Sequence, residues 1–379
     1  MIPSHRQKFN REYSPAKYAR FLALLEGRCG EPVQFRHSET PVFLPRGLVE
    51  KMERYGREMV EQLLADPRYQ EESRDAIPAA YRVPNEDPVP LFVQADFGLD
   101  QDLEAKLVEI QGFPSLYAYQ PVMAAAYREA YDIPNDMTPR EPYSDFRKAV
   151  VGRHDPENVV LTEIDPWHQK TRHDFVITQQ ELGVRTADVR ELKKEGRRLY
   201  YDKTPIERIY NRVIFDELER KHIELPFDLR DDIDVEWAGH PNWFFRLSKF
   251  SLPYLNHPAV PRTWFLDRVR RVSHPEQFVL KPLYSFAGLG VVVGPTQEQI
   301  DAVPAEHRHE YILQERVDFR PVIETPYGPT KIEVRIMYIW LDTMTPVNII
   351  IRMGRGSQMG VDHNKGMEWV GASAGFIEP

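Results

Sequence analysis

Proline most constrains what this chain can fold into: 32 prolines are spread over 379 residues, against 20 glycines. Because proline fixes φ and has no amide hydrogen to donate, it interrupts helices and central strands. This number of fixed bends argues against a bundle or coiled coil of long helices. Apolar residues make up 42% of the chain, enough to build a core and to exclude a disordered or fibrous chain. We therefore expect two or three packed units with mixed α and β structure.

The charge and the cysteine content exclude several classes of function for this chain. The formal net charge is −9, so the whole chain offers no basic surface for nucleic acid or for an anionic membrane. Cys29 is the only cysteine, which excludes an intramolecular disulfide and a thiolate zinc site and favours a reducing compartment. We find neither an apolar signal stretch at the N-terminus nor a run of about 18 apolar residues. The expectation is a cytoplasmic protein without a membrane span, its oligomeric state open.

Turn residues and changes of period divide the chain into three regions. Residues 1–88 are mostly helical; one stretch begins at a Ser14-Pro15 cap and is predicted to stop at Gly27. In residues 89–238 strands and helices alternate, which predicts buried parallel strands with helices on their faces. Residues 239–379 carry longer β-branched strands, which predicts an antiparallel sheet. The predicted fold class is α/β (α+β).

Several catalytic motifs can be set aside. The sequence contains no GxxxxGK[ST] loop, no HExxH and no GxGxxG. Gly371–Gly375 matches the GxSxG nucleophile elbow, but no histidine follows it, so we predict a small-residue strand end or turn. His168 and His173 lie in no metal-ligand pattern and are predicted to be surface or polar-network residues.

The segment Phe278–Val293 places a lysine in an apolar strand, then a loop with glycines, then a second apolar strand. Lys281 supplies a positive charge, while Gly288 and Gly290 let backbone N–H groups approach a phosphate without an intervening Cβ. Ser285 lies in the same loop. The alternative is an ordinary hairpin with an incidental lysine. Because lysine is rare inside an apolar strand unless it is paired or functional, we interpret the segment as a phosphate-binding loop.

Other polar residues interrupt the apolar sequence of the same region. They are Lys249, Gln314, Glu315, Asp318, Arg335 and Arg352. One buried charge can be accidental, but several in one sheet need one another or a ligand. The region is therefore predicted to contain a binding site.

Together these residues resemble the ATP-grasp superfamily. That family has a strand-borne Lys-Pro before a glycine-rich loop, an earlier lysine before a Leu-Pro, a strand ending in Gln-Glu, and arginines on a second sheet. Here these features look like Lys281-Pro282, Lys249 to Pro253, Gln314-Glu315, Arg335 and Arg352.

The metal motif of the family has its counterpart near the front of this chain. Asp96, followed by Glu109 and Gln111, is similar to the family's Asp…Glu-x-Asn motif. This upstream position resembles the circularly permuted ATP-grasp of glutathionylspermidine synthase-like proteins. The resemblance implies a helical region (1–88), then a pre-ATP-grasp-like α/β domain carrying the metal motif (89–238), then the ATP-grasp nucleotide-binding domain (239–379).

The resemblance also implies an ADP-forming carboxylate–amine ligase. In that reaction a substrate carboxylate attacks the γ-phosphate of ATP, and an amine displaces phosphate from the acyl phosphate. The implied cofactors are ATP and Mg²⁺, and the implied partners are a small-molecule carboxylate and an amine. The resemblance assigns the phosphates to Lys249, Lys281, Ser285, Gly288 and Gly290, adenine and ribose to Gln314, Glu315 and Asp318, the metal to Asp96, Glu109 and Gln111, and the acyl phosphate to Arg335 and Arg352.

The metal assignment has two alternatives. Asp96 and Glu109 are also compatible with two strand-end carboxylates that face solvent. Asp362 and Asn364, late in the chain, offer an alternative metal pair.

Two other functions stay open. Gln94 stands where the family has an arginine, and Gln111 stands where it has a metal-ligating asparagine. Both changes favour a non-catalytic nucleotide-binding or sensor protein, and a small-molecule kinase is the third reading. Ser115, Tyr117 and Tyr119 follow the metal motif and are expected either to line an acid pocket or to form a half-exposed aromatic strand.

Overall fold

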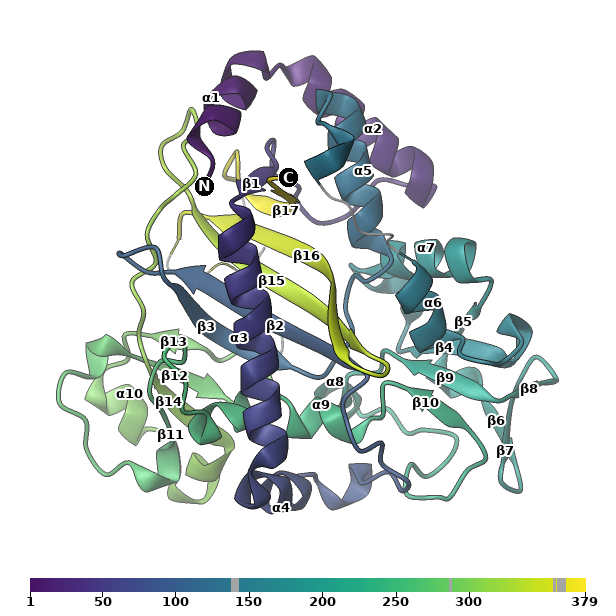
Figure 1. The fold of residues 1–379 in the computed structure, drawn as a ribbon. Helices are drawn as coiled ribbons and strands as arrows, with labels where there is room; N and C mark the ends of the chain where they lie inside the picture. The colour runs from purple at the N-terminus through teal and green to yellow at the C-terminus, as the bar shows by residue number, and fades with distance from the viewer. Residues whose placement is uncertain (138–142, 286–287, 357–358, 360–365) are drawn as a thin grey trace.

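A six-stranded sheet joins the front of the chain to its end (Figure 1). The structure, a computed structural model, describes residues 1–137, 143–285, 288–356, 359 and 366–379. The strand order is β1-β17-β16-β15-β2-β3, and neighbouring strands are antiparallel except β1 and β17. Its strands are β1 (Val42–Leu44), β2 (Phe92–Leu99), β3 (Ala105–Gln111), β15 (Lys331–Trp340), β16 (Met344–Gly354) and β17 (Gly371–Ile377).

The N-terminal region is helical, as predicted. It contains α1 (Pro3–Glu12), α2 (Pro15–Cys29), α3 (Arg46–Ala65) and α4 (Pro67–Asp75). Ser14 caps α2, because its side chain accepts a hydrogen bond from the Lys17 amide at 3.2 Å. The predicted stop at Gly27 is wrong: the helix continues to Cys29, and Gly30 takes the left-handed C-cap conformation with φ 78°.

Helix α3 covers one face of the six-stranded sheet (Figure 1). Its buried apolar residues belong to the same core as those of β2 and β15. The hydroxyl of Tyr338 on β15 donates to the carbonyl oxygens of Met52 and Glu53, at 3.2 and 3.0 Å. The helix therefore lies close against the strand at this point.

Gly56 allows this close approach. A Cβ at residue 56 would lie 2.2 Å from the hydroxyl oxygen of Tyr338. We expect Gly56→Ala to lower the free energy of unfolding by about 1–3 kcal/mol relative to Gly27→Ala, because the tyrosine or the helix must move. Gly27 also lies inside a helix, but a Cβ there meets no atom within 4 Å. Urea unfolding measures both variants, and equal stabilities would contradict the packing argument.

The middle of the chain contains the predicted parallel sheet. Its order is β10-β9-β4-β5, all parallel. The strands are β4 (Val159–Glu163), β5 (Arg185–Asp188), β9 (Arg208–Asn211) and β10 (Glu236–Ala238), and the helices of this part are α5 (Tyr119–Tyr131), α6 (Ser144–Val150), α7 (Arg172–Leu182) and α8 (Phe215–Arg220). A three-stranded antiparallel sheet, β6 (Lys193–Glu195), β7 (Arg198–Tyr201) and β8 (Thr204–Ile206), projects from it.

The prediction of parallel strands is wrong for β2, β3 and β7. Strands β2 and β3 form an antiparallel hairpin because only residues 100–104 connect them, whereas a parallel crossover needs about a dozen residues. The Asp100 carboxylate closes the turn by accepting hydrogen bonds from the amides of Asp102 and Glu104, at 3.0 and 2.9 Å. Strand pairing between β2 and β15 thus crosses the predicted boundary at residue 238, and the three-part division of the chain stays a prediction.

The last region supplies antiparallel strands to two sheets. A four-stranded antiparallel sheet has the order β11-β14-β12-β13, with β11 (Thr263–Phe265), β12 (Phe278–Pro282), β13 (Val292–Val293) and β14 (Tyr311–Glu315). Helices α9 (Asn242–Arg246) and α10 (Gln297–Asp301) belong to this region. The antiparallel prediction is confirmed, but β15, β16 and β17 belong to the six-stranded sheet. Among the described residues, no helix is long and apolar enough to cross a membrane.

Candidate functional site

One face of the six-stranded sheet carries polar residues on four neighbouring strands. They are Gln94 and Asp96 on β2, Glu109 and Gln111 on β3, Glu333 and Arg335 on β15, and Arg352 on β16. Because side chains alternate along a strand, the intervening residues of β2 and β15 point to the opposite face, where they join the core under α3. The strand register places Asp96 directly between Arg335 and Glu109.

Asp96 is buried and held by two arginines. Its side chain is 1% exposed. One carboxylate oxygen accepts from Nε of Arg335 at 2.5 Å, and the other accepts from Nη2 of Arg335 at 2.6 Å and from Arg352. Burial alone would raise the pKa of Asp96, but the two guanidinium groups outweigh it and lower the pKa. Asp96 is therefore ionised, and both of its oxygens are occupied.

Glu333 is a second buried acid beside this pair. It lies 2.5 Å from Nη2 of Arg352, so one arginine contacts both carboxylates. Burial raises the pKa of Glu333 to about 7, and the attraction of Arg352 offsets only part of that effect. Glu333 is one of the polar residues that interrupt the apolar sequence of these strands, but the predicted site does not include it. The spacing Glu333-x-Arg335 is the signal that could have found it, because it puts both side chains on one face.

The residues present do not fit a magnesium site in this arrangement. Mg²⁺ needs free carboxylate or amide oxygens, and those of Asp96 are taken by guanidinium groups. Glu109 lies 3.8 Å from Arg335 and 3.9 Å from Lys249. Gln111 donates to Gln94 at 2.7 Å, and no group of three His, Cys, Asp or Glu residues in the described part of the chain could hold a metal ion. The alternative pair, Asp362 and Asn364, lies outside the described residues.

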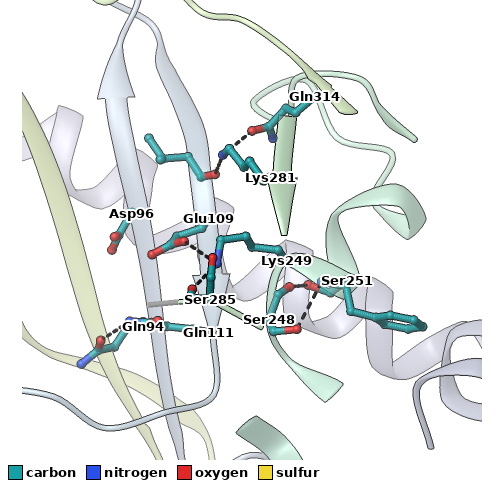
Figure 2. Close-up of polar contacts among 12 residues, drawn as sticks. Gln94, Asp96, Glu109, Gln111, Ser248, Lys249, Ser251, Lys281, Ser285 and Gln314 are labelled. Atoms are coloured by element: carbon teal, nitrogen blue, oxygen red, sulfur yellow. Dashed lines mark hydrogen bonds and ion pairs between the residues drawn. The ribbon is translucent and has the colours of Figure 1, made fainter. Parts of the chain in front are cut away.

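Lys281 reaches the site from the four-stranded sheet. It is 7% exposed and lies on β12. Its ammonium donates to the side-chain oxygen of Gln314 at 2.6 Å (Figure 2) and to the carbonyl oxygen of Val108 at 3.0 Å. Burial lowers the pKa of Lys281 to about 8, although nearby Glu109 opposes the shift. A buried ammonium therefore faces the polar sheet.

Lys249 reaches the same place from the 3₁₀ helix η6 (Lys249–Tyr254). It is 8% exposed, donates to the carbonyl oxygen of Ser285 at 2.6 Å and lies 3.9 Å from Glu109 (Figure 2). A lysine that alone would be taken for a surface residue is thus buried by the fold. It links the loop after β12 to strand β3.

These groups line one cavity of about 300 Å³ between the six-stranded sheet and the four-stranded sheet. Of the 13 residues predicted for the site, it is lined by Glu109, Gln111, Lys249, Lys281, Ser285, Gly288, Gln314, Glu315, Asp318, Arg335 and Arg352. Asp96 lies beneath the cavity, behind its arginines, and Gly290 packs toward Pro282. Residues separated by more than 200 positions in sequence therefore meet at one place.

Two buried polar atoms of uncharged side chains in this cavity have no hydrogen-bond partner among the described residues. They are the hydroxyl of Ser285 and the amide nitrogen of Gln314. Buried polar atoms without a partner are rare in native proteins because each costs free energy. Their position in the cavity points to a polar ligand.

The rim of the cavity is charged, and part of its wall is apolar. Glu315 pairs with Arg262 at 2.6 Å, and Asp318 pairs with Arg316 at 3.0 Å. The wall also contains residues outside the predicted site, among them Lys331, Phe319 and the apolar Leu107, Val279, Val291 and Val293. A flat aromatic ring fits such an apolar wall.

The prediction that Tyr117 and Tyr119 line an acid pocket is wrong. Tyr117 is buried and donates to the carbonyl oxygens of Val93 and Tyr338, at 3.1 and 2.8 Å. Tyr119 is the first residue of α5, and its buried hydroxyl lies 2.6 Å from Nε2 of His37. The alternative prediction, that these residues form a half-exposed aromatic strand, is also wrong. Ser115 does line the cavity.

Three polar residues outside this cavity are structural. Arg212 is 3.4 Å from the buried carboxylate of Asp174 and lies outside the cavity. Ser373 of the GxSxG match lies on β17, where it is buried and donates to the carbonyl oxygen of Thr40 at 2.7 Å. His173 is fully buried, with Nε2 3.7 Å from Glu31, while His168 lies near the surface.

Comparison with known proteins supports the fold. No family model matches the sequence, and no curated protein matches it. Among solved structures, a glutathione synthetase-like effector from Globodera pallida in its apo form is similar, with a TM-score of 0.66 and 11% identity over 97% of this chain and 99% of the effector. At this identity the likeness shows the fold alone. The chain shares the mixed α+β fold of this effector.

Proposed function

We propose that this cavity binds ATP and that the protein is an ADP-forming carboxylate–amine ligase of the circularly permuted ATP-grasp type. The observation that carries the proposal is the convergence of four cations on one cavity: Lys249 and Lys281 from one side, and Arg335 and Arg352 from the other. Cations at a cavity between two sheets can neutralise the charge of transferring phosphoryl groups. The front position of β2 and β3 beside β15 supports the permuted type.

The cavity residues divide into three roles in this proposal. Lys249, Lys281 and the loop with Ser285 and Gly288 hold the phosphates. Gln314, Glu315 and Asp318, with the apolar wall, hold adenine and ribose. Arg352, which is 25% exposed and faces the cavity, contacts the acyl phosphate, and Arg335 holds Asp96.

The proposed reaction needs no protein nucleophile. An oxygen of the substrate carboxylate attacks the γ-phosphorus of ATP, the bond to the β-phosphate oxygen breaks, and ADP leaves. The amine then attacks the acyl carbon, phosphate leaves, and the amine loses a proton. The chain's part is to position the reactants and to neutralise charge. Magnesium has no assigned role here, because Asp96 is occupied by arginines.

Calorimetric titration tests the proposal. We expect a non-hydrolysable ATP analogue to bind the wild type, and Arg352→Met to bind it with nearly unchanged affinity but to lose ADP release in the presence of acid and amine mixtures. Titrations with and without Mg²⁺ measure any metal requirement. No binding of the analogue under either condition would overturn the proposal.

One observation favours a second function, a non-catalytic nucleotide-binding protein. Asp96 is neutralised by arginines, and the two amides Gln94 and Gln111 bond to each other. If the analogue binds but no pair of acid and amine releases ADP, this second function replaces the first.

A further inference from the structure

A second cavity, of about 480 Å³, lies away from the nucleotide site. It forms where residues 83–91 meet the start of β10 and the turn between β15 and β16. Its lining residues and those of the first cavity have no member in common. The proposed function makes no use of it.

Two tryptophans and several aliphatic residues form the walls of this cavity. Trp237 and Trp340 are half-buried, and among the described residues neither indole N–H donates a hydrogen bond. Val89, Leu91 and Val235 add apolar surface. Indole groups offer both apolar area and a π face that attracts cations.

Asp87 is the acid of this cavity that lacks a counter-ion. No hydrogen bond or ion pair to its carboxylate is found among the described residues, although the Trp243 indole donates to its backbone carbonyl at 3.1 Å. Burial raises the pKa of Asp87, and Arg208 opposes that shift. The carboxylate is thus partly desolvated without a bonded cation.

The neighbouring charges are already paired. Arg208 donates to the carbonyl oxygens of Ala149 and Val150 and to Glu236, at 2.9, 3.0 and 2.7 Å. Glu236 also contacts Arg153 at 2.7 Å. These bonds occupy the guanidinium of Arg208, and none of them goes to Asp87.

The remaining titratable groups of the cavity are also paired or neutral. His240 has Nε2 3.1 Å from the Pro84 carbonyl oxygen and accepts from the Asn242 amide through Nδ1, which requires the neutral tautomer; burial also lowers its pKa. Asp231 is bonded to Lys194 at 2.6 Å. Asp87 is left as the acid that a ligand can neutralise.

We propose that this cavity binds a small molecule that carries a protonated amine on an apolar or aromatic body. The ammonium pairs with Asp87, and the body lies against Trp237 and Trp340. A carboxylate in a partly desolvated, aromatic cavity favours such a cation over a neutral molecule of the same shape. This inference goes beyond the proposed function and does not depend on it.

Benzylamine and benzyl alcohol are matched probes for this site, because they have nearly the same shape and differ in charge. In calorimetry and tryptophan fluorescence at pH 7, we expect benzylamine to bind the wild type at least tenfold more tightly than benzyl alcohol. Asp87→Asn should abolish the difference, and Asp231→Asn, which removes an acid already bonded to Lys194, should preserve it. Binding of the ATP analogue should be the same in all three proteins.

Three results would overturn the proposal: equal affinity of the two probes for the wild type, no binding of either probe, or an unchanged preference in Asp87→Asn. The comparison of probes needs no variant, so it decides the question even if a substitution unfolds the protein. Loss of ATP-analogue binding in the wild type would count against the proposed function and leave this inference standing.

Discussion

Replacing Asp96 with alanine is expected to lower the free energy of unfolding by about 3–5 kcal/mol, the usual cost of leaving a buried charge without its partner. Asp96 accepts three hydrogen bonds from Arg335 and Arg352 in the middle of the six-stranded sheet. Without it, the two guanidinium groups keep only Glu109 and Glu333 as counter-charges among the described residues. Asp96→Asn should cost less than alanine because an amide oxygen still accepts one of these bonds.

Chemical unfolding measured by circular dichroism tests this expectation. Asp102→Ala is the matched control, because Asp102 is exposed in the turn of the same hairpin, and we expect it to change stability by less than about 0.5 kcal/mol. A loss below about 1 kcal/mol in Asp96→Ala would show that the arginines do not depend on Asp96. Asp96 would then be free for a metal, and the magnesium assignment would be reopened.

The low pKa of Asp96 also determines how its contribution to folding stability changes with pH. Its folded-state pKa lies below the ordinary value, so its contribution is present above about pH 4, the usual pKa of an aspartate, and is lost as pH falls through the folded pKa. Glu333 changes the folding stability in the opposite direction as pH rises. Its pKa is raised to about 7, so stability falls as pH rises from about 4.5 to 7.

Local patterns in the sequence were sufficient to predict many of the elements. The strands around Lys281 and Gln314 are short apolar runs, and they occur where predicted. The pairing of β2 and β3 was mispredicted because which strand neighbours which depends on contacts far apart in sequence. The five-residue connection at 100–104 was the available local signal for a hairpin.

The same holds for the site: local sequence predicts which residues lie there, whereas their contacts depend on residues far apart in the chain. The sequence identified most of the charged residues that line the cavity, because charged side chains in apolar strands are conspicuous. It could not predict the state of Asp96, because a carboxylate can be neutralised by a metal or by a guanidinium group. The guanidinium of Arg335 comes from 239 residues further along the chain. Likewise, Lys249 is buried only because β3 and the loop at Ser285 close around it.

Lys281→Met is expected to reduce the affinity for an ATP analogue about 100-fold, which corresponds to about 2.7 kcal/mol. Methionine keeps the aliphatic length but removes the ammonium. Among the described residues, Lys281 uses two of its three donors on Gln314 and Val108, which fixes the ammonium in the cavity and leaves one donor for a phosphate. Calorimetry measures the loss, and Lys193→Met, at an exposed lysine on β6, is the matched control.

The pH dependence of binding separates a phosphate contact from a structural role of Lys281. Burial lowers its pKa to about 8, so the charged fraction falls as pH rises from 7 to 9. Because a phosphate binds the charged form, the affinity of the wild type should decrease over this range, while Lys281→Met, which has no charge to lose, should stay flat. A structural lysine would weaken binding in the variant without this difference in slope. Parallel pH profiles for the two proteins would therefore remove Lys281 from the phosphate site, even if the variant bound the analogue poorly.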